Sequence, residues 1–170
     1  MSRAASASDE NKVQVYVSFD VEHDGELYDL LVEQSQAPGS GFVVASGSRR
    51  SDAKDENNAG ARRRIGNVAQ VIVICGEQTA GCVSVVDELR AAQEQNKPYF
   101  LVWGRRESMC TKPEGAKPSD GMYSWTADII EEQIAQVRRA AEREARASAL
   151  KRQRGAPRAE PEQVEAPSGD

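Results

Sequence analysis

The sequence predicts an α/β fold in which a parallel sheet of four or five strands is covered by helices on both faces. Short runs rich in β-branched and aromatic residues alternate with segments whose apolar residues recur at helical spacing. One run, residues 68–75 (VAQVIVIC), is apolar nearly throughout, which is typical of a strand covered on both faces. Right-handed crossovers between consecutive strands then predict the strand order 2-1-3-4-5, with a short fifth strand at the edge.

The first part of the domain is predicted to contain a strand, a helix and a second strand. Residues 13–19 (VQVYVSF) form the first strand, which stops at Asp20. Residues 24–36 form the first helix, and the breakers in residues 38–41 (PGSG) end it. Residues 42–45 form a short second strand. Residues 46–60 are charged, rich in Asn, Ser and Gly and without periodicity, so we expect a mobile surface loop there.

The second part repeats the alternation. After the third strand (68–75), a helix begins near Ala80, and its apolar stripe comprises Cys82, Val85, Val86, Leu89 and Ala92. Residues 99–103 (YFLVW) form the fourth strand. A long connection over 104–123 holds the short fifth strand near its end. The last helix begins near residues 124–126 and runs at least to Val137.

The two ends of the chain are predicted to lie outside the folded domain, which spans residues 12–140. Residues 1–11 form a disordered arm and residues 155–170 a disordered tail, both by composition. Residues 141–154 favour helix by propensity but offer almost no apolar face, so they predict an exposed helical extension. Its basic residues fit either an RNA-binding arm or a solvated helix face, and the second is the simpler interpretation.

Composition excludes several classes of function. The formal charge of −5 gives no positive field for a phosphate backbone, so nucleic acid is not an expected partner. No apolar run approaches the roughly 18 to 20 residues that cross a bilayer, and no secretory signal is present, so we expect a soluble cytoplasmic protein. Three cysteines without a CxxC pair and a single histidine, His23, argue against disulfides, thiolate metal sites and polyhistidine metal sites.

The predicted topology locates a ligand site. In an open parallel sheet, ligands bind beyond the carboxyl ends of the strands at which the strand order reverses. In this order those are the first and third strands. Residues 18–22 and residues 75–79 should therefore line the site.

Three segments together resemble the TIR-like domains of Thoeris antiphage defence and their flavodoxin-like relatives. They are VYVSFDVEHD at the first strand, VIVICGEQTAGCVSVVDELRAAQEQNKPYFLVWG across the third and fourth strands, and CTKPEGAKPSDGMYSWTADIIEEQI. In that family, a strand ending in Ser-Phe-Asp is followed by a strand ending in Cys-Gly, then a threonine, then an acidic residue nine positions later. This chain has Phe19, Asp20, Gly76, Thr79 and Glu88 at those places.

The resemblance implies a flavodoxin-like three-layer fold and an activity on NAD. TIR-like enzymes of this kind use NAD as a substrate, without another cofactor, and cleave the bond between nicotinamide and ribose. They then hydrolyse or cyclise the product, often to a signalling nucleotide. The family often carries a Trp four residues before the glutamate, whereas this chain has Ser84 there. The resemblance also implies a homo-oligomer, a downstream effector or a phage-derived trigger.

Helical geometry by itself singles out Glu88 as the better-placed carboxylate. It falls on the flank of the buried stripe beside Gly81 and Ser84, whereas Asp87 points to water. A carboxylate there can stabilise the positive charge that develops on ribose and can orient or deprotonate the attacking hydroxyl. No metal is required. The alternative is that Glu88 is an ordinary charged residue of a surface helix. Without the family resemblance, helical geometry would favour this alternative.

The residues around Glu88 have structural alternatives as well. Thr79 is placed to cap the third helix, whose free N–H groups could bind a diphosphate. Asp20 could bind a ribose or fix its own loop. Phe19 could contact a base but fits the core equally. With Gly76 and Ser84, these residues form the predicted substrate site.

Two other functions remain open on sequence grounds. A non-enzymatic TIR-like module that binds a nucleotide or a protein is favoured somewhat by Ser84. A receiver-like phosphoacceptor built on Asp20 would need a lysine after the fourth strand, where residues 104–106 (GRR) stand instead. Residues 76–79 (GEQT) are not a GxGxxG loop and no Walker motif exists, so a Rossmann dehydrogenase or an NTPase is not expected.

Overall fold

The computed structural model describes residues 11–155. Its helices and strands follow one another in the order β1 (Val13–Ser18), α1 (Gly25–Ser35), β2 (Phe42–Gly47), α2 (Ala59–Gly66), β3 (Gln70–Cys75), α3 (Val83–Glu94), β4 (Tyr99–Trp103), β5 (Met122–Ser124) and α4 (Ala127–Gly155). Three short 3-10 helices lie at Arg50–Lys54, Glu56–Asn58 and Thr79–Gly81. The predicted N-terminal arm and C-terminal tail lie outside the described residues, apart from residues 11 and 155.

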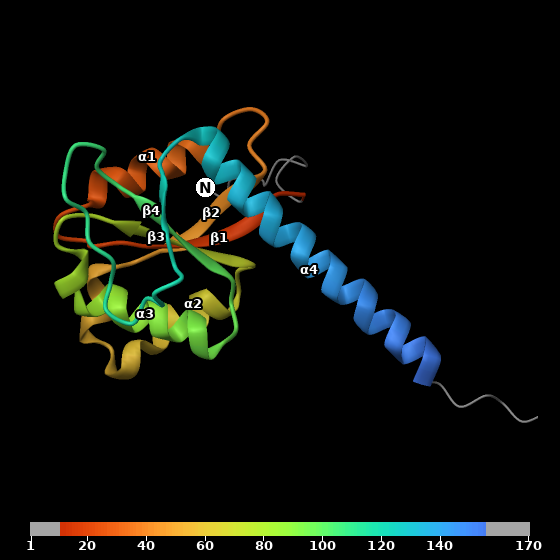
Figure 1. Cartoon of the computed structure of the whole chain (residues 1–170). Helices are drawn as coiled ribbons and strands as arrows, with labels where there is room; N and C mark the ends of the chain where they lie inside the picture. Colours follow the sequence, from red (N-terminus) through yellow and green to blue (C-terminus); the bar gives the residue numbers. More distant parts are fainter. Residues whose placement is uncertain (1–10, 156–170) are drawn as a thin grey trace, which may run out of the picture. The chain divides into compact units, whose positions relative to one another are not determined.

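All five strands are parallel, in the order β2-β1-β3-β4-β5. This confirms the predicted α/β fold and its strand order. The sheet is the middle of three layers: α1 and the first part of α4 cover one face, and α2 and α3 cover the other (Figure 1). The arrangement is that of a flavodoxin-like fold.

Each face of the sheet has its own hydrophobic core, because successive side chains of a strand point to opposite faces. Val15 and Val17 of β1 pack toward α1, whereas Tyr16 packs toward α2 and α3. All six residues of β3 are buried, as its nearly continuous apolar run predicts for a central strand. The two cores therefore meet only through this strand layer.

The last helix, α4, begins where Thr126 accepts a hydrogen bond from the Ile129 N–H at 3.2 Å. Ile130 and Ile134 are buried in the core on the α1 side. Residues 139–155 continue the helix, are exposed throughout and form a unit separate from residues 11–138. Among the residues that the structure describes, no helix combines the length and the apolar character needed to cross a bilayer.

Residues 46–60, expected to form a mobile surface loop, contain regular structure and buried polar side chains that the sequence did not predict. Strand β2 extends to Gly47, two 3-10 helices follow, and Ser48, Asp52 and Asn58 are buried. Asp52 is held by an ion pair with Arg64 at 2.7 Å and by the Arg49 N–H at 2.9 Å. Short polar side chains that are buried through hydrogen bonds leave no apolar periodicity in the sequence, and so this structured segment resembled a loop.

Replacing Ile134 by Ala should lower the free energy of unfolding by about 2–4 kcal/mol, because the lost methyl groups leave a cavity in the α1-side core. Leu150→Ala is the matched control. Leu150 lies on the same helix but is 56% exposed, so its replacement should change stability by no more than about 0.5 kcal/mol. Urea unfolding followed by circular dichroism measures both variants. Equal losses would show that residues beyond 138 also belong to the folded core.

Candidate functional site

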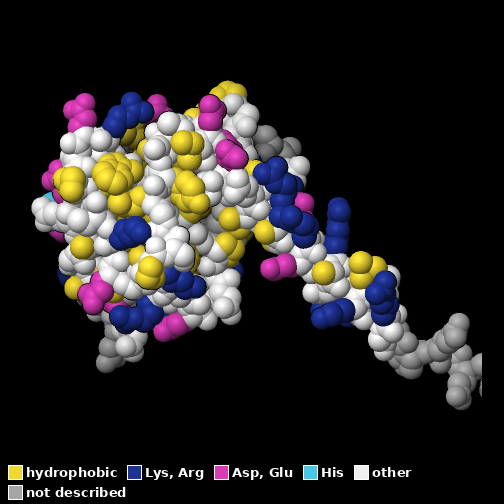
Figure 2. All heavy atoms as spheres, in the orientation of Figure 1, with side chains coloured by type: hydrophobic (Ala, Val, Ile, Leu, Met, Phe, Trp, Pro, Cys, Tyr) yellow, Lys and Arg dark blue, Asp and Glu magenta, His cyan; other side chains and the backbone are white. Residues whose placement is uncertain are grey.

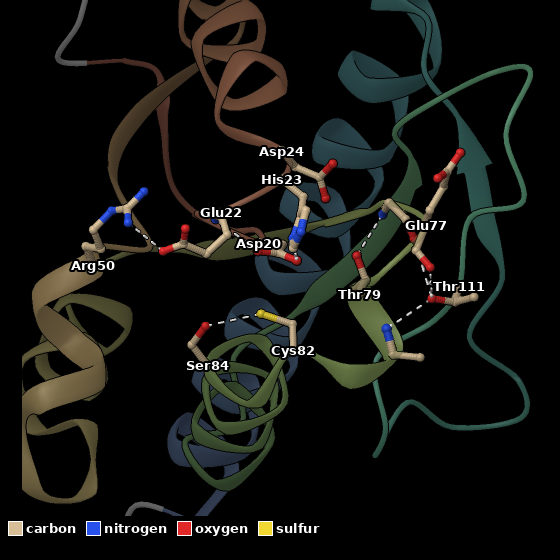
Figure 3. Close-up of polar contacts among 12 residues, drawn as sticks. Asp20, Glu22, His23, Asp24, Arg50, Glu77, Thr79, Cys82, Ser84 and Thr111 are labelled. Atoms are coloured by element: carbon tan, nitrogen blue, oxygen red, sulfur yellow. Dashed lines mark hydrogen bonds and ion pairs between the residues drawn. The ribbon is translucent and has the colours of Figure 1, made fainter.

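The candidate site lies at the carboxyl ends of β1 and β3, where the strand order reverses. Figure 3 shows the loop after β1, with Asp20, His23 and Asp24, facing the loop after β3, with Glu77 and Thr79. Glu88, on α3, contacts the end of β1 through a hydrogen bond from Ser18. The predicted location of the site is thus occupied by polar side chains from three elements.

Glu88 is buried, with only 1% of its surface exposed, and both of its carboxyl oxygens are hydrogen-bonded. The hydroxyls of Ser18 and Ser48 donate to Oε2 at 2.5 and 2.6 Å, and the Tyr16 hydroxyl donates to Oε1 at 3.1 Å. Ser18 is the last residue of β1, and Ser48 follows β2 directly. The carboxyl group therefore joins α3 to the ends of two neighbouring strands.

Burial raises the pKa of Glu88 from its ordinary 4.5 to about 7. The hydrogen bonds from Ser18, Ser48 and Tyr16 act in the opposite sense and lower the pKa, because a carboxylate accepts them all. The negative charge of Asp52 raises it further. Both protonation states of Glu88 are consequently populated near neutral pH, as is required of a group that must take up and release a proton.

A β-bulge explains how Ser48 reaches Glu88. Along β1, Val15 pairs with Val44 but Tyr16 pairs with Ser46, so Ala45 is an extra residue in β2. Paired residues of parallel strands point to the same face, and the bulge therefore turns the end of β2 over. Without it, the side chain of Ser48 would point to the α1 side of the sheet, away from Glu88.

A second polar layer surrounds the carboxyl group. The guanidinium of Arg64 lies 5.8 Å from the centre of the Tyr16 ring and pairs with Asp52. Burial, and next the charge of Glu88, raise the pKa of the Tyr16 hydroxyl far above its ordinary range, so this group remains a donor. The guanidinium of Arg64, on α2, is thus held between the Tyr16 ring and the Asp52 carboxylate.

Phe19 does not face Glu88. Its ring lies in the core on the α1 side and stacks on Tyr28, with ring centres 4.7 Å apart. Phe19 nevertheless joins the network through its backbone, because its N–H donates to the Ser48 hydroxyl at 3.0 Å. The alternation of side chains along the strand places Ser18 and Phe19 on opposite faces.

Asp20 fixes its own loop. One carboxylate oxygen accepts the Glu22 N–H at 3.0 Å, and the other lies 2.7 Å from Nδ1 of His23. Glu22 in turn pairs with Arg50 at 2.7 Å (Figure 3). Of the two roles predicted for Asp20, the structure displays the loop-fixing one.

The prediction that Thr79 caps α3 is wrong. Its hydroxyl accepts the Gly76 N–H at 2.7 Å and is fully buried. A 3-10 turn, Thr79–Gly81, separates it from α3, and the N-cap residue of that helix is Cys82, whose side chain makes no capping bond. Thr79 therefore shapes the loop after β3 and leaves the start of α3 one turn further along the chain.

Ser84 lies on α3 one turn before Glu88, half-buried, with its hydroxyl 3.3 Å from Sγ of Cys82 (Figure 3). Gly76 lies against Asp24, because a Cβ atom at position 76 would overlap the Asp24 carboxylate. These positions adjoin the strand ends. They form no hydrogen bond with Glu88 among the described residues.

Sequence reasoning missed Ser48 and Asp24. Asp24 is buried, with Oδ1 paired to Arg105 at 3.0 Å and Oδ2 without a hydrogen-bond partner. Burial raises its pKa, which the pairing with Arg105 lowers in part. The Ser48 contact depends on the bulge in β2, and the Asp24 contact on the approach of two loops. Neither leaves a pattern in the sequence.

No group of three or more His, Cys, Asp and Glu side chains within residues 11–155 is arranged to hold a metal ion. A scan against protein-family models and a search of curated proteins gave no match to the chain. What the arrangement can do chemically therefore follows from its geometry. It offers a carboxyl group that titrates near neutrality, with three hydroxyls around it.

The free energy of unfolding should fall as the pH rises from about 4.5 to about 7. Between these values the folded protein keeps a proton on Glu88 that the unfolded chain has lost, and above about 7 the effect is complete. The pKa difference sets an upper limit of about 3 kcal/mol. In Glu88→Gln this loss should be absent, whereas Asp87→Asn should keep it. Urea unfolding at several pH values measures it, and identical profiles for wild type and Glu88→Gln would contradict it.

Gly76→Ala should destabilise the protein by about 1–3 kcal/mol, because the new methyl group overlaps the buried Asp24 carboxylate. In an Asp24→Ala background the same change should cost at least about 1 kcal/mol less. Gly81→Ala is the matched control, since nothing lies within 4 Å of a Cβ atom there. Urea unfolding of wild type, the two single variants and the double variant gives the coupling free energy between positions 76 and 24. If the two losses of stability are additive, the new methyl group does not contact the Asp24 carboxylate.

Proposed function

We propose that this domain is a TIR-like NAD-processing protein, in which Glu88 acts at the bond between ribose and nicotinamide. The observation that supports this proposal is the carboxyl group of Glu88 at the ends of β1 and β2, with a pKa of about 7. A buried glutamate at a strand edge whose charge state changes near neutrality is a candidate for acid–base chemistry. We propose NAD as the substrate because the motifs around Phe19, Gly76 and Thr79 resemble those of TIR-like domains that act on NAD.

In the proposed reaction the ionised carboxylate faces the ribose. It stabilises the positive charge that develops on the sugar as nicotinamide leaves, and then takes the proton of the attacking hydroxyl group or water. The attacking oxygen forms the new bond to the ribose carbon as the bond to nicotinamide breaks. Ser18 and Tyr16 hold the carboxylate in place during both steps.

The burial of Glu88 places a condition on this chemistry. Because only 1% of the residue is exposed, a substrate must displace one of its hydroxyl partners. Ser48 is the partner that can be displaced, since Ser18 and Tyr16 belong to a central strand, whereas Ser48 begins the segment of 3-10 helices between β2 and α2. A ribose hydroxyl can then donate to Oε2 in its place. We propose that assembly of several copies, or a trigger protein, opens this segment, and that the protein acts in the cytoplasm.

A second candidate function is a non-enzymatic TIR-like module that binds a nucleotide or a protein partner. The same burial favours it. Three hydroxyl donors satisfy the carboxyl group, which can then serve only to tie α3 to the sheet. Ser84, which stands where TIR-like enzymes often carry a Trp, also favours this second function.

Purified protein incubated with NAD at high protein concentration should release nicotinamide. Glu88→Gln should lower the rate at least about 100-fold, because the amide cannot accept a proton. Asp87→Asn, the neighbouring carboxylate on the same helix, should stay within about twofold of wild type. Nicotinamide is quantified by chromatography, and circular dichroism confirms that each variant is folded.

Two results would contradict the assignment. Release that survives Glu88→Gln would mean that another group performs the reaction. Absence of release from every assembled form of wild type, together with saturable NAD binding, would support the binding module instead.

A further inference from the structure

A cavity lies on the α1 side of the sheet, opposite the face that carries Glu88. Its cavity has a volume of about 350 Å³ and is lined by Leu27, Leu30, Trp103, Gly104, Arg106, Ser124 and Trp125. Figure 2 shows hydrophobic side chains at the surface of this upper part of the domain, where Figure 1 draws α1 and the segment after β4. The cavity is large enough for a small organic molecule.

The position of the cavity fits ligand binding. Trp103 is the last residue of β4 and Ser124 the last residue of β5, so the cavity opens beyond the carboxyl ends of two parallel strands. Ligands of α/β folds bind beyond the carboxyl ends of the strands, although in this sheet the strand order reverses at β1 and β3 and not at β4 and β5. Neither strand contributes to the Glu88 network.

The walls on the α1 side are apolar. Leu27 is buried in the core, and Leu30, one turn along α1, is 54% exposed. Trp125 packs against the same core, and its indole N–H, the only polar group of that side chain, donates to Oε1 of Gln34 at 3.2 Å. Trp125 therefore presents only apolar ring surface to a ligand.

Arg106 is the one charged side chain among the residues that line the cavity. Its neighbour Arg105 is engaged by Asp24 and Glu26, at 3.0 and 2.5 Å. Within residues 11–155, by contrast, no side chain forms an ion pair or a hydrogen bond with Arg106. A guanidinium without an anionic partner at the edge of an apolar cavity is a receptor for a carboxylate.

We propose that this cavity binds a small aromatic carboxylate. The ring lies against Leu27, Leu30 and Trp125, and the carboxylate pairs with Arg106. The site is separate from the proposed NAD chemistry, because the sheet lies between the cavity and Glu88.

Intrinsic fluorescence provides a direct test, because Trp125 packs on the α1 side and lines the cavity. Titration of the full chain with benzoate should change the emission saturably, with half-saturation at millimolar concentration or below. Acetate, which carries the charge without the ring, should produce no saturable change. Benzamide, the neutral isostere, should bind about 3- to 10-fold more weakly than benzoate.

Substitutions at two exposed residues, Arg106 and Leu30, identify the site. Arg106→Gln should weaken benzoate binding about 3- to 10-fold and remove its advantage over benzamide, whereas Arg90→Gln, on the other side of the sheet, should change neither. Leu30→Glu should weaken benzoate binding by placing a negative charge in the wall. Glu88→Gln should leave benzoate binding unchanged, so failure of this proposal is distinguishable from failure of the proposed NAD chemistry.

Three outcomes would overturn the proposal. The first is the absence of saturable benzoate binding in wild type. The second is equal benzoate affinity in Arg106→Gln and wild type. The third is emission that changes with protein concentration alone, together with a rise in molecular mass, because the apolar wall would then be covered by a second copy of the chain.

Discussion

The buried carboxyl group of Glu88 is the interaction on which the candidate functional edge of this domain depends. It ties α3 to the end of β1 through Ser18 and to the segment after β2 through Ser48. Three elements distant in sequence therefore meet at one side chain. An unpaired buried carboxylate would cost several kcal/mol, so the three hydroxyl donors are a condition for placing it there at all.

The same burial that raises the pKa of Glu88 also restricts access to it. A carboxyl group in contact with water would titrate near its ordinary value and would be less suited to proton transfer at neutral pH. The proposed function therefore requires exchange of one protein hydroxyl for a ligand hydroxyl, so that the carboxylate stays hydrogen-bonded throughout. Ser48 is the partner proposed for this exchange because it follows the last residue of the edge strand β2, whereas Ser18 and Tyr16 belong to the central strand β1.

The two faces of the sheet have different chemical character at their carboxyl edge. The α2 and α3 side holds a buried polar network around Glu88 and Tyr16. The α1 side holds an apolar cavity with Arg106 at its edge. Strand alternation separates them, since Ser18 points to one side and Phe19 to the other. One sheet can thus support two sites that do not share side chains.

The sequence by itself determined the layers, the strand order and the place of Glu88 on the flank of a buried helical stripe, because apolar periodicity records which face of each element is covered. It could not determine which polar groups meet at that carboxylate. The bulge at Ala45 turns Ser48 toward Glu88, the alternation of β1 turns the Phe19 ring away, and a 3-10 turn displaces Thr79 from the start of α3. These outcomes depend on register and on contacts between distant loops. Only the tertiary structure decides them, since hydrogen bonds between short polar side chains impose no period on the chain.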